Sequence, residues 1–358
     1  KDIMIQSDDS GFMKIALEPK GVILDIASWN YPLMVAVSAV APAVLAGNAV
    51  LLKHSSQTPL CGIAFEEFFR KAGAPEGLVT AITASRVDAD VLFDLPEIRS
   101  VFFTGSVEAG YTVNRRASGL IADVGLELGG KDPAYVRSDA DIASIIPILA
   151  DAAFYNTGQS CCAVERIYVH SSLYEEFVEA FTKEVKTYKV GDPMEKDTYI
   201  GPLTQKKQVG VLCRQVEDAT AKGASVILGG NATSVAGKGN YFEPTVITNT
   251  NHDMLVMTEE SFGPIIGIMP VSGDEQALEL MNDSKYGLTA SIWTEDFEFA
   301  VEFGRRIETG TVYMNRADAV APELSWTGVK DSGKGCTLSR IGFLNMTQPK
   351  SYNFKLSK

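Results

Sequence analysis

The sequence predicts an α/β protein built on a parallel, doubly wound sheet, and three observations support this fold class. Short apolar runs alternate with helical runs from Gly21 onwards. These short runs are apolar on both faces, as expected for strands that helices cover on either side. The chain has 358 residues, of which 46% are hydrophobic, enough for two domains and a large core.

Composition and charge exclude several classes of partner. The formal net charge of -13 argues against binding to a nucleic-acid phosphate backbone. No uninterrupted apolar run is long enough to span a membrane. The 5 cysteines are an odd number without metal-ligand spacing, which is typical of a reducing compartment. We therefore expect a cytoplasmic protein that holds no metal and binds neither nucleic acid nor membrane.

The expected elements follow in chain order. Residues 1–20 form a plausible hairpin. Strands are then expected at 21–26, 48–53, 78–82 and 101–103, and helices at 33–46, 58–71 and 88–93. After a helix at 142–153, a second αβ unit has strands at 166–169, 225–228, 265–269, 289–293 and 309–315 and helices at 173–188, 205–222, 274–281 and 297–307. We expect an exposed loop at 229–240, a glycine-rich loop at 326–336 and a polar alternating tail at 350–358.

Three strand ends carry residues suited to ligand binding, because ligands of doubly wound sheets lie at the carboxyl ends of the strands. Asn30 follows the first strand and could donate a hydrogen bond to developing negative charge. Lys53 ends the second strand and could contact ribose or phosphate, or be a solvated surface cation. Gly105 and Ser106 open a helix, an arrangement that aims backbone amides at a phosphate.

Two further stretches contain reactive side chains. Cys161 and Cys162 follow a glycine between a helix and a strand, so either thiol is a candidate nucleophile; alternatively, both are small buried hydrophobes. Glu127 lies between leucines ahead of two glycines. It is either a general base or a carboxylate bonded to backbone amides. Glu260 either belongs to a solvated turn or binds a ribose, with Phe262 packing against a ring.

In this order, the motifs resemble those of the aldehyde dehydrogenase superfamily, and the resemblance covers essentially the whole chain. The matching motifs are Trp-Asn-x-Pro (29–32), Lys53 with Gln-Thr-Pro (57–59), Phe-Thr-Gly-Ser (103–106), Glu-Leu-Gly-Gly-Lys (127–131), Gly-Gln-x-Cys (158–161), Glu-x-Phe-Gly-Pro (260–264) and Asn315. Agreement at all of them is specific to this family.

The resemblance implies a domain organisation and a mechanism. It implies an oligomerisation hairpin at 1–20, a Rossmann-like nucleotide-binding domain at 21–128, an α/β catalytic domain at 129–340 and an oligomerisation strand at 341–358. Cys161 matches the nucleophile, with Cys162 as second choice, Asn30 the oxyanion donor and Glu127 the general base. The implied reaction oxidises an aldehyde to the acid through a thiohemiacetal and a thioester, with a homodimeric or homotetrameric enzyme.

The resemblance also implies NAD or NADP as the cofactor and a substrate tunnel. The implied cofactor contacts are Ala27, Ser28, Trp29, Lys53, Ser56, Gly105, Ser106, Gly129, Glu260 and Phe262. The implied tunnel residues are Phe154, Tyr155, Ser160 and Trp326.

Three departures from the family pattern change these expectations. The helical segment that usually precedes the hairpin is absent, so the chain is either trimmed or has a reduced nucleotide-binding domain. Ser56 stands where many NAD-preferring members have glutamate, which predicts tolerance of NADP. Cys336-Thr337-Leu338-Ser339 replaces the usual Arg-Glu-Leu-Gly, which removes an auxiliary proton relay.

Two alternative functions remain at this point. One is a thioester-forming relative that depends on coenzyme A, although Glu127 favours hydrolysis. The other is a catalytically silent or structural protein that keeps the fold, although the combination of Cys161, Glu127 and Asn30 argues against it.

Overall fold

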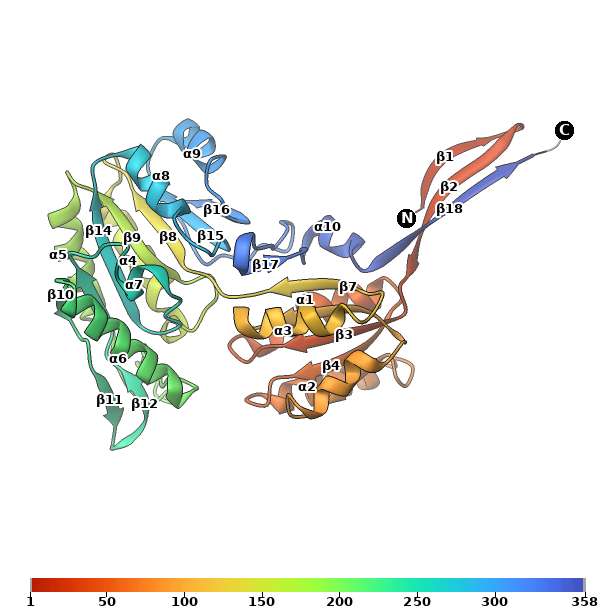
Figure 1. Ribbon diagram of the computed structural model, residues 1–358, viewed down its shortest axis with the longest axis horizontal. Helices are drawn as coiled ribbons and strands as arrows, with labels where there is room; N and C mark the ends of the chain where they lie inside the picture. The colour runs from red at the N-terminus through yellow and green to blue at the C-terminus, as the bar shows by residue number, and fades with distance from the viewer. Residues whose placement is uncertain (1, 357–358) are drawn as a thin grey trace. The chain divides into compact units, whose positions relative to one another are not determined.

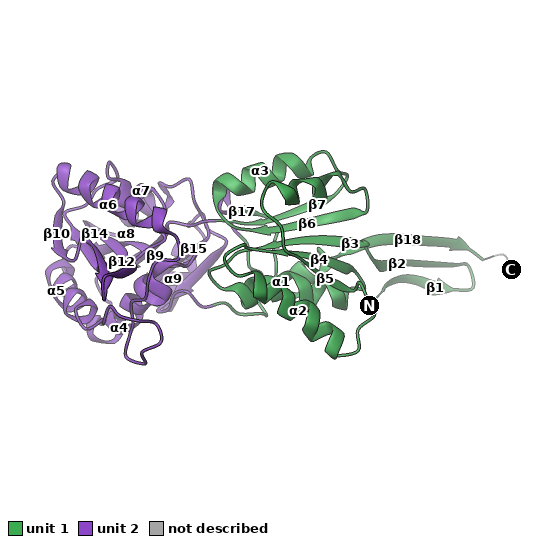
Figure 2. Ribbon diagram, turned by 90° about the horizontal axis from the view of Figure 1, so that it is seen from below, with its two compact units in different colours: residues 1–128, 320–327, 333–358 green, residues 129–319, 328–332 purple. Residues whose placement is uncertain are grey.

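Two largely parallel sheets organise the chain, one in each of two units (Figure 1). The computed structural model describes residues 2–356; residues 1 and 357–358, the ends of the two expected terminal segments, lie outside them. Unit 1 comprises Lys1–Leu128, Val320–Thr327 and Gly333–Lys358, and unit 2 comprises Gly129–Ala319 and Gly328–Ser332 (Figure 2).

The main sheet of unit 1 has six strands in the order β17-β7-β6-β3-β4-β5. Five of them run parallel, and β17 is antiparallel to β7 at one edge. In chain order the strands are β3 (Val22–Ala27), β4 (Ala49–His54), β5 (Val79–Ile82), β6 (Ile98–Thr104), β7 (Asp123–Glu127) and β17 (Gly333–Lys334). The chain moves from β3 outwards to β5 and then returns to β6 on the other side of β3. The strand order therefore reverses between β3 and β6, where open α/β sheets bind their ligands.

Helices cover both faces of this sheet, as the doubly wound prediction requires. Ile23 packs in a core with α1 (Pro32–Leu45) and α2 (Pro59–Lys71). Its neighbour Leu24 packs in a second core with α3 (Val107–Ala117) and the 3₁₀ helix η1 (Asp88–Asp94). Figure 2 shows α3 on one face and α1 and α2 on the other. Strands that are apolar on both sides are thus explained by burial on both sides.

The two terminal segments of the chain pair in a separate antiparallel sheet of unit 1. Its order is β1-β2-β18, with β1 at Ile3–Asp8, β2 at Gly11–Pro19 and β18 at Thr347–Lys355. The register runs from Thr347 opposite Pro19 to Lys355 opposite Gly11. The short helix α10 (Ser339–Leu344) leads into β18. The expected hairpin is present, and three apolar side chains of β1 are exposed: Ile3, Met4 and Ile5.

The sheet of unit 2 has seven strands in the order β10-β13-β14-β9-β8-β15-β16. All neighbouring pairs are parallel except β10 with β13. In chain order the strands are β8 (Asp132–Val136), β9 (Val164–His170), β10 (Ser225–Leu228), β13 (Thr245–Thr248), β14 (Ile265–Val271), β15 (Thr289–Trp293) and β16 (Thr311–Met314).

Helices again cover both faces. One core includes side chains of α4 (Ile142–Phe154) and α5 (Tyr174–Val185). The opposite core includes side chains of α6 (Lys206–Ala221), α7 (Leu255–Thr258), α8 (Asp274–Asn282) and α9 (Phe297–Gly304). Within residues 2–356, none of the helices combines the length and apolar character that crossing a membrane requires.

The prediction of a loop at 229–240 is wrong in part, because two strands form there. They are β11 (Ala232–Val235) and β12 (Lys238–Phe242), paired antiparallel. Ala236 and Gly237 both have positive φ, 50° and 72°, as a tight hairpin turn requires. Tyr241 and Phe242 at the end of β12 are buried. The Gly- and Ser-rich composition suggested a loop, whereas the Phe242 side chain packs in the core of unit 2 and anchors the second strand.

Asp25 is a buried acid in the middle of β3, with a side chain that is 2% exposed. Its Oδ2 atom has no hydrogen-bond partner among the described residues. Burial raises the pKa of this carboxyl well above its ordinary value. The folded state therefore holds a proton that the unfolded chain releases, and stability is lost as the pH rises towards the folded-state pKa.

We predict that Asp25→Asn raises the free energy of unfolding by on the order of 1 kcal/mol at about pH 8, because the amide has no charge to bury. The gain should shrink towards about pH 5, where the aspartic acid is already neutral in the fold. Thermal unfolding across this range measures it, with the exposed Asp9→Asn as control. A gain that is independent of pH would contradict the prediction.

Candidate active site

Cys161 lies in the turn between the 3₁₀ turn η2 (Tyr155–Gly158) and β9. Three consecutive residues of η2 have left-handed backbone angles: Asn156 at φ 51°, Thr157 at φ 60° and Gly158 at φ 68°. Such angles cost energy in residues with a side chain, and they persist at functional sites where surrounding contacts maintain them. The turn therefore holds Cys161 in a defined position ahead of β9.

Backbone amides from one neighbouring loop maintain this turn. Gly201 N donates to Thr157 Oγ1 over 3.0 Å. Thr204 N donates to Gln159 Oε1, also over 3.0 Å. The Gln159 side chain in turn donates to Asn156 O. The glutamine of the Gly-Gln-x-Cys motif thus cross-links the strained turn that precedes the cysteine.

Two glycines let backbone segments approach each other closely around the cysteine. A Cβ at Gly158 would lie 2.3 Å from Gly263 O, and a Cβ at Gly130 would lie 2.4 Å from Cys161 O. Neither distance is compatible with a side chain unless the backbone moves. The glycines of three motifs, which are distant in the sequence, therefore serve one tightly packed region of unit 2.

The structure distinguishes the two adjacent cysteines. Cys162 is 4% exposed, and its Sγ donates a hydrogen bond to Asp318 Oδ1 over 2.8 Å. The neighbouring Cys161 thiol, burial and the Asp318 carboxylate raise the pKa of the Cys162 thiol well above its ordinary value. Cys161 is partly exposed. Because a nucleophile must be a thiolate that reaches its substrate, this arrangement favours Cys161.

A buried ion pair lies next to the cysteine turn. Lys131 Nζ contacts Glu165 Oε2 at 2.8 Å, and the two side chains are 0% and 4% exposed. Glu165 also accepts hydrogen bonds from the backbone amides of Ser261 and Phe262, over 2.7 and 2.8 Å. Lys131 Nζ donates to Ser261 Oγ as well. All the charged atoms of the pair thus have polar partners, as buried charges require.

This ion pair holds the loop that contains Glu260 and Phe262. Glu260 Oε1 accepts a hydrogen bond from Gly130 N over 3.1 Å, and a Cβ at Gly129 would lie 2.4 Å from the same oxygen. Burial and the charge of Glu165 raise the pKa of Glu260 to about 8. Phe262 has a left-handed φ of 47°. The predicted cofactor residues Gly129, Glu260 and Phe262 therefore lie together in unit 2.

The predicted ligand-binding residues of unit 1 lie along the carboxyl edge of its main sheet. Ala27 and Ile26 in β3 pair with His54 and Lys53 in β4, and Thr104 in β6 pairs with Glu127 in β7. Ser28, Trp29, Asn30, Ser56, Gly105 and Ser106 follow these strand ends. The edge includes the point between β3 and β6 where the strand order reverses.

Two of these strand ends have features that suit an anionic ligand. Lys53 is 7% exposed, and no acidic side chain among the described residues pairs with its ammonium group. Burial and the positive charge of Arg86 lower the pKa of Lys53. Ser106 Oγ caps α3 by accepting from Ala109 N, and Gly105 is packed so that a Cβ would lie 2.5 Å from the Phe103 ring. Ser56 is exposed.

Glu127 ends β7 with its carboxyl group buried. Thr337 Oγ1 donates to Glu127 Oε1 over 3.4 Å, and Glu127 Oε2 has no hydrogen-bond partner in the described part of the chain. Burial raises the pKa of Glu127 well above its ordinary value, and the hydrogen bond from Thr337 opposes that shift. Asn30 Oδ1 accepts a hydrogen bond from Ser28 Oγ over 2.7 Å.

The four expected tunnel residues have different surroundings. Phe154 is fully buried in the core of unit 2 beside the rings of Phe181 and Tyr188. Tyr155 is 50% exposed, whereas Ser160 is 2% exposed. Trp326 belongs to unit 1, where it forms a backbone bridge with Thr337.

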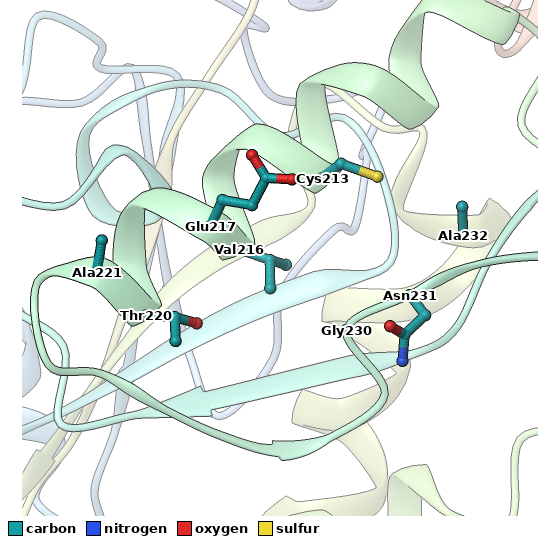
Figure 3. A pocket seen from close by; sticks show the side chains of 8 residues that line it. All are labelled: Cys213, Val216, Glu217, Thr220, Ala221, Gly230, Asn231 and Ala232. Carbon is teal, nitrogen blue, oxygen red and sulfur yellow. The ribbon is translucent and has the colours of Figure 1, made fainter.

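A shallow cavity of about 560 Å³ lies elsewhere on unit 2 (Figure 3). It lies between α6 and the residues at the start of β11, and none of the predicted site residues lines it. The lining residues are Cys213, Val216, Glu217, Thr220, Ala221, Gly230, Asn231 and Ala232. Among the described side chains, no three His, Cys, Asp or Glu residues lie close enough together to hold a metal ion.

The predicted residues therefore form two groups. Asn30, Lys53 and Glu127, with the residues after the same strands, belong to unit 1, whereas Cys161 and Glu260, with their neighbours, belong to unit 2. Glu165 and Asp318, whose contacts hold the loops around the two cysteines, were not predicted from the sequence. Glu165 has no local signal, because its partner Lys131 is 34 positions away. Asp318 has no local signal, because its partner Cys162 is 156 positions away.

Comparison with known proteins points to one family. The family model described as "Aldehyde dehydrogenase family" matches residues 1–352. An aldehyde dehydrogenase of Paenarthrobacter nicotinovorans is 39% identical over 330 residues, which cover 92% of this chain and 72% of the relative. A succinate-semialdehyde dehydrogenase [NADP(+)] of Deinococcus radiodurans is 37% identical, over 93% of this chain and 69% of the relative.

Solved structures agree with the sequence relatives. Betaine aldehyde dehydrogenase of Staphylococcus aureus, in complex with NAD+, has a TM-score of 0.94 and is 31% identical. The match covers 100% of this chain and 72% of that structure.

We predict that Glu165→Gln destabilises the protein by about 3–5 kcal/mol, because it leaves the buried Lys131 ammonium without a counter-charge. The double substitution Lys131→Met/Glu165→Gln should cost less than the sum of the two single ones, since they share one interaction. Thermal or urea unfolding measures these differences.

The matched control is Lys189→Met, which breaks the exposed ion pair between Lys189 and Asp197 and should leave stability unchanged. If Glu165→Gln were as mild as this control, the buried pair would not stabilise the fold.

Proposed function

Because the chain belongs to the aldehyde dehydrogenase family, we propose that it oxidises an aldehyde to the carboxylic acid with reduction of NAD or NADP. The observation that supports this proposal most strongly is the Cys161 turn. A partly exposed thiol follows a strained turn that close backbone contacts at Gly130 and Gly158 hold, beside a second thiol that is buried and bonded to Asp318. We infer that this turn presents a nucleophile.

The residues at the sheet edge of unit 1 suit the phosphate and ribose groups of NAD or NADP. Lys53 is a nearly buried cation without an acidic partner in the described chain, and Ser106 caps the amino end of a helix that begins directly after a strand end. We propose that these residues hold the cofactor with Ala27, Ser28, Trp29, Ser56 and Gly105, and that Gly129, Glu260 and Phe262 do so from unit 2. When bound, the nicotinamide accepts the hydride that leaves the substrate carbon.

The proposed mechanism assigns three roles to the chain. The Cys161 thiolate adds to the aldehyde carbon, and the Asn30 amide donates a hydrogen bond to the oxyanion that forms. After the hydride leaves, the substrate is a thioester of Cys161. Glu127 removes a proton from water, the hydroxide adds to the thioester carbonyl, and the carbon–sulfur bond breaks to release the acid. Burial raises the pKa of Glu127 well above its ordinary value, which makes the carboxylate a stronger base.

Further roles follow from the same proposal. We propose that residues 21–128 bind the nucleotide and that residues 129–340 carry the catalytic thiol. Residues 1–20 and 341–358 join subunits of a homodimer or homotetramer, which the exposed apolar side chains of the β1 edge strand support. Phe154, Tyr155, Ser160 and Trp326 border the route of the aldehyde, and the enzyme works in the reducing cytoplasm, as its cysteine content suggests.

The activity is tested by the growth of NAD(P)H absorbance with a simple aldehyde. We predict that the NAD(P)H absorbance increases without coenzyme A and that Cys161→Ala abolishes this increase, because no other group forms the thioester. The control Cys213→Ala removes a thiol that lines the cavity in Figure 3 and should retain wild-type rates. An absorbance increase that requires coenzyme A would indicate an acylating enzyme. Cofactor binding without any absorbance increase would indicate a catalytically silent protein.

The cofactor preference is tested at Ser56. We predict that the wild type accepts NADP and that Ser56→Glu lowers kcat/KM for NADP relative to NAD by about tenfold, because a carboxylate repels the 2′-phosphate. Ser234→Glu adds the same charge on β11 and serves as control. A strong wild-type preference for NAD that Ser56→Glu leaves unchanged would contradict the prediction.

A further inference from the structure

Thr337 provides the hydrogen bond to the buried carboxyl of Glu127. Its Oγ1 lies 3.4 Å from Glu127 Oε1, and both residues belong to unit 1. In the described part of the chain, Glu127 Oε2 has no partner. A distance of 3.4 Å is long for a bond between a hydroxyl and a carboxyl oxygen, but catalytic hydrogen bonds are often long without substrate and shorten when it binds. One carboxyl oxygen is thus engaged, whereas the other is buried without a partner in the described part of the chain.

The backbone around Thr337 fixes the position of this hydroxyl. Thr337 and Trp326 exchange two backbone hydrogen bonds, each of 2.9 Å, and the Thr337 side chain is buried. The preceding strand β17 pairs with β7, so that Gly333 lies opposite Glu127 itself. On the other side, a Cβ at Gly342 would lie 2.5 Å from the carbonyl carbon of Thr337. The residue therefore has little freedom to move away from Glu127.

We propose that Thr337 is a positioning residue for the general base: its hydroxyl holds one oxygen of Glu127 so that the other accepts the proton of the hydrolytic water. This inference rests on the proposed function, in which Glu127 activates water. In that step a water O–H bond breaks, a bond from the proton to Glu127 Oε2 forms, and the hydroxide adds to the thioester carbonyl.

The chemistry of the hydroxyl explains why threonine suits this position. The position is the one at which the family pattern has glutamate in Arg-Glu-Leu-Gly. A second carboxylate so close to Glu127 would repel its charge and disfavour ionisation. A hydroxyl instead donates a hydrogen bond that stabilises the ionised form, and this opposes the effect of burial on the pKa of Glu127. In this chain the hydroxyl of Thr337, a neutral hydrogen-bond donor, therefore takes the place of the family's carboxylate.

The test compares Thr337→Val, which removes the hydroxyl and keeps the shape, with Thr337→Ser, which keeps the hydroxyl. The rate of the first turnover reports thiolate attack and hydride transfer, and the steady-state rate with saturating aldehyde reports thioester hydrolysis where hydrolysis limits turnover. We expect Thr337→Val to retain the first-turnover rate and to lower the hydrolysis rate by about three- to tenfold, the effect of one hydrogen bond.

A pH profile separates positioning from stability. Without the hydroxyl the pKa of Glu127 rises further, so the rising limb of the hydrolysis rate should move to higher pH in Thr337→Val and return in Thr337→Ser. The matched control is Thr347→Val, since Thr347 is 7% exposed and its hydroxyl donates only to the backbone oxygen of Leu344, over 2.8 Å. This control should leave both rates and the pH profile unchanged.

Two outcomes would overturn the inference. In the first, Thr337→Val lowers the melting temperature but keeps the wild-type hydrolysis rate and pH profile. In the second, Thr337→Ser is as slow as Thr337→Val. Glu127→Gln distinguishes these outcomes from failure of the proposed function. If Glu127→Gln still hydrolyses the thioester at the wild-type rate, Glu127 is not the general base. If Glu127→Gln does not hydrolyse the thioester but Thr337→Val does so at the wild-type rate, only the role of Thr337 is rejected.

Discussion

The arrangement of unit 2 depends on the buried ion pair between Lys131 and Glu165. Lys131 precedes β8, Glu165 lies at the start of β9, and the loop that Glu165 binds precedes β14. Since these three strands are neighbours in the sheet, the pair connects the amino ends of adjacent strands. Both charges are withdrawn from water, so they are stable only in this one geometry. The glycine-lined turn of Cys161 and the Glu260 loop are both built around that geometry.

The two units use opposite edges of their sheets. In unit 1, the candidate residues follow the carboxyl ends of β3, β4, β6 and β7, as the general rule for doubly wound sheets predicts. In unit 2, Cys161 and Glu260 precede the strands β9 and β14. No comparable general rule places ligands at the amino edge of a sheet. In unit 2, close contacts between backbone segments position the site residues at that edge. This explains why glycine occurs in each of the motifs that meet there.

Most strands of the two main sheets and most helices were predicted from the sequence because their hydrophobic patterns are local, whereas β7, β8, β13 and β17 were not predicted. Thr289–Trp293 and Ser225–Leu228 are confirmed without change, and the family assignment is confirmed by the match over residues 1–352. The hairpin at 232–242 was missed, since its anchor, Phe242, lies beyond the polar stretch. The pairing of Lys131 with Glu165, and of Cys162 with Asp318, is not encoded in any local pattern. Such contacts depend on which strands become neighbours, and this is settled only by the complete fold.

In the proposed mechanism, the Cys161 sulfur carries the substrate and the Glu127 carboxylate activates the water that releases it. The most direct measurement is the mass of the peptide that contains residues 161 and 162 after Glu127→Gln has reacted with an aldehyde and oxidised cofactor. We expect the acyl group to accumulate as a thioester on Cys161, because no base activates the water that would remove it. An unmodified peptide despite cofactor reduction, or an acyl group on Cys162, would contradict it.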